Sequence, residues 1–107
     1  MAVLVATPIS VLAQALTGDQ IAQQWSGKIL AGQLPKGGAI QMRLGADGSA
    51  EMSGATARTG TWRPVPSGYC VTWAAQRENC FTAARESEGT IVVRGKNGVV
   101  LWRFTAP

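Results

Sequence analysis

Residues 60–81 read GTWRPVPSGYCVTWAAQRENCF. In the middle of this segment the large residues Tyr69, Val71 and Trp73 alternate with smaller ones, which is the period-two pattern of a strand with one apolar face. Prolines and glycine precede the strand, and a polar run follows it, so turns are expected on both sides. The segment therefore predicts a β-hairpin with an aromatic inner face.

The chain has two cysteines, Cys70 and Cys80, and they fall on the two arms of this hairpin. A turn centred on Ala75 places them directly opposite each other, and the same register places Tyr69 opposite Phe81. Nine intervening residues are too many for a C-x-x-C redox motif. In an oxidising compartment the pair predicts a structural disulfide, worth about 2.5–3 kcal/mol by the loop-entropy argument.

From residue 28 to the end, short β-favouring runs recur about every ten residues, separated by turn signals such as Asp47-Gly48 and Asn97-Gly98. The predicted strands are Lys28–Leu30, Ala39–Leu44, Ala50–Ser53, Gly60–Arg63, Tyr69–Trp73, Cys80–Arg85, Thr90–Arg94 and Val99–Thr105. No connection has room for a crossover helix, which indicates antiparallel pairing. We predict an all-β domain over residues 28–107, an up-and-down meander closing into a roughly eight-stranded barrel, with an open or sandwich-like sheet as the alternative.

Residues 16–27 carry helix signals. Thr17 and Gln20 have the spacing of a capping box, and Gly27 suits the residue that ends a helix. A helix this short is marginal in water and must pack against another element. We interpret it as a lid or plug on the barrel that carries Trp25.

The first fifteen residues, MAVLVATPISVLAQA, contain no charged side chain and end in Ala13-Gln14-Ala15, a small-x-small pattern. This pattern predicts an export signal cleaved after Ala15, and hence a periplasmic or secreted protein. The apolar part is too short for a permanent transmembrane anchor. The alternative is a buried N-terminal strand.

The amino-acid composition excludes several classes of catalytic and metal site. The chain has no histidine, so a histidine-based triad or metal site is excluded, and we expect no metal or cofactor. Its ten basic and six acidic residues give a net charge of +4, but the seven arginines are dispersed, which does not favour nucleic-acid binding. We predict a non-enzymatic protein. The competing class is a cell-envelope hydrolase with two catalytic carboxylates drawn from Asp19, Asp47, Glu51, Glu78, Glu86 and Glu88.

Aromatic side chains are the candidate contacts for a ligand or partner, and core packing is the alternative role for each. The candidates are Trp25, Trp62, Tyr69, Trp73 and Trp102. Inward-facing aromatics have enough volume to fill a small barrel, so we expect no large internal cavity. Binding is then expected on the outer surface or at a mouth, with Trp25 as the most exposed aromatic.

The strand pattern, the tripeptide Gly60-Thr61-Trp62 and the cysteine hairpin of residues 69–81 resemble small exported bacterial β-barrel proteins of the lipocalin-like and avidin-like kinds. They also resemble the alkaline-protease inhibitors of Gram-negative bacteria. The resemblance implies a binding module for a small apolar ligand or for another protein. As an alternative, it implies a protease inhibitor that inserts Leu16–Trp25 into the cleft of an enzyme.

Overall fold

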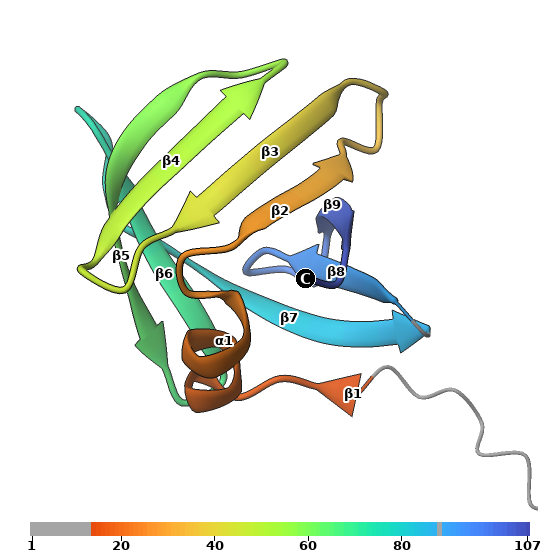
Figure 1. Cartoon of the computed structure of the whole chain (residues 1–107). Helices are drawn as coiled ribbons and strands as arrows, with labels where there is room; N and C mark the ends of the chain where they lie inside the picture. The colour runs from red at the N-terminus through yellow and green to blue at the C-terminus, as the bar shows by residue number, and fades with distance from the viewer. Residues whose placement is uncertain (1–13, 88) are drawn as a thin grey trace, which may run out of the picture.

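The computed structural model describes residues 14–87 and 89–107. Its elements are β1 (Gln14–Ala15), α1 (Gly18–Trp25), β2 (Ile29–Gln33), β3 (Ala39–Leu44), β4 (Ser49–Gly54), β5 (Arg58–Val65), β6 (Gly68–Trp73), β7 (Asn79–Ser87), β8 (Thr90–Arg94) and β9 (Val100–Thr105). From β2 to β9 each strand pairs antiparallel with the next, and β9 pairs back with β2 (Figure 1). The predicted fold, an eight-stranded antiparallel barrel with one short N-terminal helix, is confirmed.

The barrel closes where β2 meets β9. Gly32 lies opposite Phe104, and Gln33 lies opposite Arg103. A Cβ atom on Gly32 would stand 2.1 Å from the carbonyl oxygen of Arg103, so the two strands can approach this closely only with glycine at that position. In an open sheet, the facing edges of β2 and β9 would have no partner strand. Closure pairs these two edges with each other.

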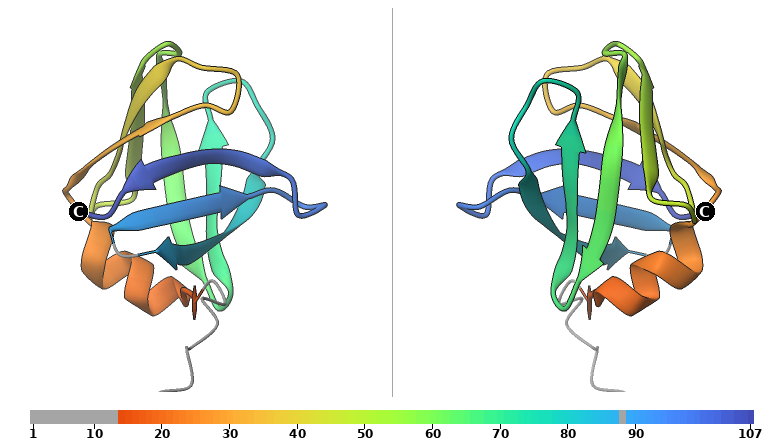
Figure 2. Two further views of the ribbon diagram at one scale, coloured as in Figure 1. Left: turned by 90° about the vertical axis from the view of Figure 1, so that its right-hand side faces the viewer. Right: turned by 90° about the vertical axis from the view of Figure 1, so that its left-hand side faces the viewer.

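The two ends of the barrel differ (Figures 1 and 2). At one end α1 lies against β5 and β6, near the turn that joins these strands. The other end, which we call the mouth, is formed by four hairpin connections. They are residues 34–38, 55–57, 74–78 and 95–99.

The helix begins and ends where its sequence signals indicate. The backbone N–H of Gln20 donates to the Thr17 hydroxyl over 3.2 Å, and the N–H of Thr17 donates to the Gln20 side chain over 2.9 Å, completing the capping box. After the helix, Gly27 has a φ of +76°, and its N–H donates to the carbonyl of Leu44. The end of α1 is thereby fixed to the end of β3.

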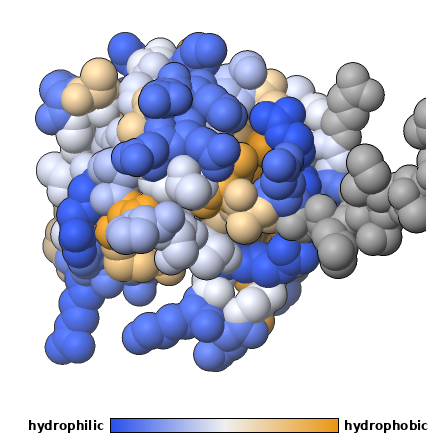
Figure 3. All heavy atoms as spheres, turned by 90° about the horizontal axis from the view of Figure 1, so that it is seen from below, coloured by the Kyte–Doolittle hydropathy of each residue, from blue (hydrophilic) through white to orange (hydrophobic). Residues whose placement is uncertain are grey.

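The apolar face of α1 closes the barrel. Ile21 and Trp25 have 0% exposure, and the Trp25 ring packs edge-to-face on Tyr69 at 5.6 Å and on Phe104 at 5.0 Å. The expectation that Trp25 is the most exposed aromatic was therefore wrong. A helix of eight residues gains its stability by burying its apolar face, and the largest side chain on that face is Trp25. Seen from the α1 side, the surface is mostly hydrophilic, with small separate apolar patches (Figure 3).

The hairpin of β6 and β7 has the predicted register. Tyr69 lies opposite Phe81, and Cys70 lies opposite Cys80, to which it is disulfide-bonded. Ala75, at the turn, has a φ of +63°. Because neighbouring side chains on a strand point to opposite faces, the disulfide is on the outer face and the aromatic pair is inside.

The strand β5 is longer than predicted because it continues through Pro64 to Val65. Pro64 pairs with Tyr69 on β6, whereas pairing with β4 on the other side ends at Thr61. The missing N–H of the proline therefore needs no partner on that side, which is the condition under which proline is tolerated in a strand.

The N-terminal prediction is only partly covered by the described residues. Residues 1–13, most of the predicted export signal, lie outside them. Gln14 and Ala15 form β1, which pairs with Arg85 and Ala84 of β7. Cleavage after Ala15 would remove this short strand and would leave α1 and the eight barrel strands intact.

Candidate functional site

The inner face of the barrel can be followed through its register, because residues directly opposite each other on antiparallel strands share a face. On β6 the inner residues are Tyr69, Val71 and Trp73. Across the barrel, Met42 of β3 lies opposite Met52 of β4 on the same inner face. Of these positions Tyr69 lies nearest the α1 end, where it packs on Trp25, and Trp73 lies next to the mouth connection at residues 74–78.

A pocket of about 330 Å³ lies in the half of the barrel that opens at the mouth, and we call it the mouth pocket. Its walls are apolar and buried, and they are formed chiefly by Ile40, Met42, Val71, Trp73, Val93 and Trp102. It reaches the barrel end at Leu34 and Thr56, in the β2–β3 and β4–β5 connections. The pocket is small and opens at the barrel end, which is one of the two places, a mouth or the outer surface, where binding was expected.

Aromatic rings form the floor of the mouth pocket. Tyr69 and Trp102 line it, and below them Trp25 packs on both Tyr69 and Phe104, while Trp102 packs on Phe104 at 4.6 Å. Burial raises the pKa of the Tyr69 phenol, and a side-chain hydrogen bond with Trp102 opposes that rise. The phenol is therefore neutral at physiological pH, and the floor of the pocket carries no charge.

The rim of the mouth pocket is apolar. Leu34, Met52 and Phe81 are half-buried, and Leu101 is 37% exposed. They come from four different hairpins of the barrel, so the apolar rim is distributed around the opening. Concave apolar surface with a few polar groups is the usual character of a small-molecule site.

One charged side chain lines the mouth pocket. Arg58 lies opposite Met52 at the start of β5, and its exposed side chain stands at the rim, where it borders both the mouth pocket and the outer face of the sheet. Its Nη1 donates to Oε1 of Gln76, in the β6–β7 connection, over 3.1 Å. The guanidinium retains further N–H donors that are available to a bound molecule.

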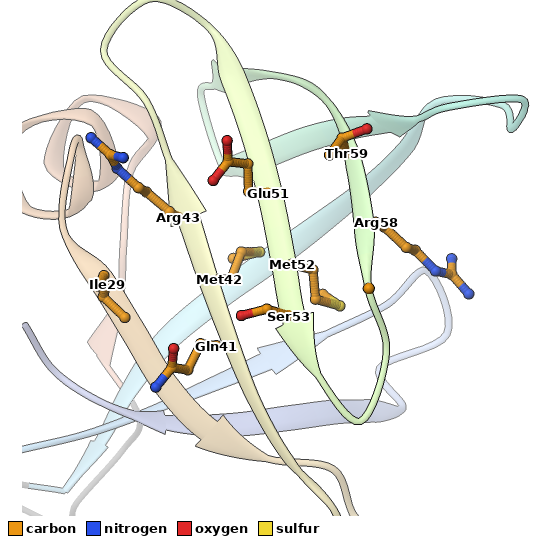
Figure 4. A pocket seen from close by; sticks show the side chains of 10 residues that line it. Ile29, Gln41, Met42, Arg43, Glu51, Met52, Ser53, Arg58 and Thr59 are labelled. Atoms are coloured by element: carbon orange, nitrogen blue, oxygen red, sulfur yellow. The ribbon is translucent and has the colours of Figure 1, made fainter.

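A second hollow, of about 490 Å³, lies on the outer face of β2 to β5 (Figure 4). Arg43 and Glu51 face each other there on neighbouring strands, and Ile29 beside them is 62% exposed. Arg58 also borders this hollow, and its side chain points away from Arg43 and Glu51, to the right of β5 in Figure 4. This hollow is open along the sheet and offers chiefly polar side chains, so it fits an apolar ligand less well than the mouth pocket does.

Of the five candidate aromatic residues, three line the mouth pocket and two do not. Tyr69, Trp73 and Trp102 meet at the mouth pocket. Trp25 lies beneath it in the plug, and Trp62 lies elsewhere, with its Nε1 donating to the carbonyl of Gly45 over 2.7 Å. Trp25 and Trp62 therefore act in packing in this structure.

Sequence reasoning did not identify the aliphatic and sulfur-containing wall of the pocket. The alternation of Ile40, Met42 and Leu44 with polar residues marks an inner face, and this was the available signal. No sequence signal marks Arg58 as a pocket residue, because the run around it is small and polar. Its place depends on the register between β4 and β5.

The positions of the described carboxylates do not support a two-carboxylate hydrolase mechanism. Glu78 accepts two hydrogen bonds from Arg63, at 2.8 and 2.9 Å, and this partner lowers the pKa of the Glu78 carboxyl. Glu86 is paired with Arg103 at 3.1 Å. Among the described residues no carboxylate is buried, so none has the apolar surroundings that raise a catalytic acid's pKa.

The segment proposed for insertion into a protease is part of the core. Leu16, Ile21 and Trp25 are all buried against the barrel. An inhibitor that inserted these side chains into an enzyme cleft would first have to remove them from the core.

Comparisons of the chain with protein-family models, with curated proteins and with solved structures find no match. The resemblance to exported barrel proteins is therefore supported at the level of the closed eight-stranded barrel and its disulfide. Within the described ranges, no helix has the length and apolar character needed to cross a bilayer.

Proposed function

We propose that the protein is a non-enzymatic binding module that takes a small apolar molecule into the mouth pocket. The observation that carries the proposal is the asymmetry of the barrel. Trp25 on α1 fills one end, whereas the other end contains an apolar pocket with a partly exposed apolar rim. An apolar rim exposed to water is a cost that a bound apolar molecule would offset.

The volume of the mouth pocket indicates the size of its ligand. A pocket of about 330 Å³ is at the lower end of the range for small-molecule sites, roughly 300–1,000 Å³. At about 30 Å³ for each water molecule in the liquid, this volume corresponds to roughly eleven waters. The ligand we propose has about that number of non-hydrogen atoms, or slightly more if part of it extends past the rim.

The disulfide supports the proposed location. Disulfides persist in oxidising compartments, and the Cys70–Cys80 bond lies on the outer face with Cys80 exposed. Together with the predicted export signal at residues 1–15, it supports a periplasmic or secreted binding module. A lipocalin-like or avidin-like role agrees with the open pocket better than an inhibitor role that needs the buried segment Leu16–Trp25.

A binding titration with 1-decanol tests the proposal. Trp73 and Trp102 line the pocket, so binding is expected to change the tryptophan fluorescence of the protein, and calorimetry gives the affinity. Val71→Phe adds volume to the pocket wall and is expected to weaken binding by at least about tenfold. Val99→Phe is the matched control, since Val99 is 60% exposed outside the pocket, and its affinity is expected to equal that of the wild type.

Both variants must retain the far-UV circular dichroism of the wild type. Equal affinity for 1-decanol in Val71→Phe and wild type would show that the mouth pocket is not the site. Absence of any saturable binding to the wild type would contradict the proposed function.

A further inference from the structure

We propose that the ligand of the mouth pocket is an anionic amphiphile, with an apolar chain inside the barrel and a carboxylate at the rim paired with Arg58. This inference rests on the proposed function and specifies the chemistry of its ligand. It joins two observations, the position of Arg58 and the distribution of charge around the mouth.

Arg58 is placed to meet a ligand at the opening. It lines the mouth pocket from the rim, opposite Met52 at the first position of β5, where its side chain is exposed to solvent. The hydrogen bond from its Nη1 to Gln76 ties the guanidinium to the neighbouring β6–β7 connection and leaves its other N–H groups for an acceptor. A planar guanidinium binds a carboxylate through two parallel hydrogen bonds, which makes it selective for that group.

No carboxylate of the described chain pairs with Arg58. The ion pairs within residues 14–87 and 89–107 are Arg63 with Glu78 and Arg103 with Glu86. A solvent-exposed cation at the rim of an apolar pocket, with a neutral amide as its side-chain partner, is suited to an anion that comes from outside the chain.

The other mouth connections add positive charge. Residues 34–38 contain Lys36, residues 74–78 contain Arg77, and residues 95–99 contain Lys96, while Arg58 follows directly on residues 55–57. The acidic residue in these connections is Glu78, and both of its carboxylate oxygens accept hydrogen bonds from Arg63. The opening is therefore surrounded by cations, and their field favours the approach of an anion.

The same geometry orients the ligand. The floor of the pocket, at Tyr69 and Trp102, is buried, and a carboxylate placed there would lose its hydration without a cationic partner. At the rim the carboxylate meets Arg58 and remains in contact with water. The chain thus points towards Trp102, and the charged head stays at the mouth.

The pocket volume favours a free acid with one short chain over a bilayer lipid with two long ones. Decanoate and 1-decanol are suitable probes, because they carry the same chain and differ at the head group. Both are titrated by calorimetry at low ionic strength and above the pKa of the acid, with decanoate below its micelle-forming concentration and 1-decanol below its solubility limit.

We expect the wild type to bind decanoate about tenfold more tightly than 1-decanol, the magnitude of a charge-assisted hydrogen-bonded pair at an accessible site. Arg58→Gln is expected to weaken decanoate binding about tenfold and to leave 1-decanol binding unchanged. Arg43→Gln is the matched control, because it removes the same charge from the outer face of β3, and we expect less than about a twofold effect on either probe.

Equal loss of decanoate affinity in Arg58→Gln and Arg43→Gln would assign the effect to overall charge and overturn the role of Arg58. Binding of 1-decanol with no preference for decanoate would overturn the anionic ligand and leave the proposed function standing. Failure of both probes to bind the wild type would instead remove the proposed function.

The anionic head group could belong to a free acid or to a lipid in a bilayer. Sedimentation with vesicles of anionic phospholipid distinguishes these two sources. We expect the protein to remain in the supernatant. Co-sedimentation that is lost in Arg58→Gln and kept in Arg43→Gln would assign Arg58 to a bilayer surface and overturn the assignment to a free acid.

Discussion

Replacement of Trp25 by alanine tests whether α1 is part of the core. The side chain is fully buried, and its ring packs on Tyr69 and Phe104. Truncation of a buried tryptophan to alanine removes its transfer energy and leaves a void, together about 3–5 kcal/mol. Its Nε1 has no hydrogen-bond partner among the described residues, and the removal of an unsatisfied donor offsets part of that loss. We therefore expect a loss near the lower limit, about 3 kcal/mol.

This loss is large for a small domain, whose whole stability is about 5–15 kcal/mol. The assay is urea unfolding followed by far-UV circular dichroism with the disulfide intact, since fluorescence would change with the number of tryptophans. Trp25→Phe keeps a ring at the site and removes the unsatisfied donor, so it is expected to cost about 1 kcal/mol.

Trp73→Ala provides the comparison at the other end of the barrel. Trp73 lines the mouth pocket, so the space it leaves joins a pocket that is already open, and we expect a smaller loss than for Trp25→Ala. A loss below about 1 kcal/mol for Trp25→Ala would refute the assignment of α1 to the core, and a larger loss for Trp73→Ala than for Trp25→Ala would contradict the open pocket beside Trp73.

Three further perturbations test other parts of the fold. Replacing both cysteines by alanine is expected to lower the free energy of unfolding by about 2.5–3 kcal/mol, as urea unfolding would measure, and no change would mean that the bridge does not constrain the unfolded chain. Gly18→Ala is expected to cost about 1–3 kcal/mol in the same assay despite alanine's higher helix propensity, because the added Cβ would stand 2.1 Å from the Val65 carbonyl oxygen; a gain in stability would contradict this packing. Arg63→Ala is expected to destabilise the protein at neutral pH, because Arg63 holds the pKa of Glu78 below its ordinary 4.5 in the folded state. Stability from a lowered carboxyl pKa is present above the unfolded-state value and is lost as the pH falls through the folded-state value, so the difference between wild type and Arg63→Ala should vanish in acid, and a difference that persists there would assign the effect to packing.

The disulfide hairpin was predictable because local rules agree there. Alternation set the inner face, the turn at Ala75 set the register, and the spacing of Cys70 and Cys80 fitted that register. The helix was equally predictable from its capping box at Thr17, because capping depends on neighbouring residues. Barrel closure followed from the number of strands and the absence of crossover connections.

The site was harder to predict because it depends on long-range packing. The volume of aromatic side chains suggested a filled barrel, but Trp25 enters from outside the strands and packs on Tyr69 and Phe104, while the rings of Trp73 and Trp102 stand around an open pocket. Counting inward residues cannot show at which height each one lies along the barrel axis. The position of Arg58 likewise depends on the register between β4 and β5 across a connection of three residues.

The most direct measurement of the central claim is a titration of ¹⁵N-labelled protein with 1-decanol, observed through its four tryptophan indole N–H signals. Trp73 and Trp102 line the mouth pocket, whereas Trp25 lies in the plug and the Trp62 indole is bonded to Gly45. We predict saturable shifts of the Trp73 and Trp102 signals, with the Trp25 and Trp62 signals nearly unmoved. Shifts confined to Trp25 or Trp62, or to backbone signals of the outer face at Ile29 and Gln41, would contradict binding in the mouth pocket.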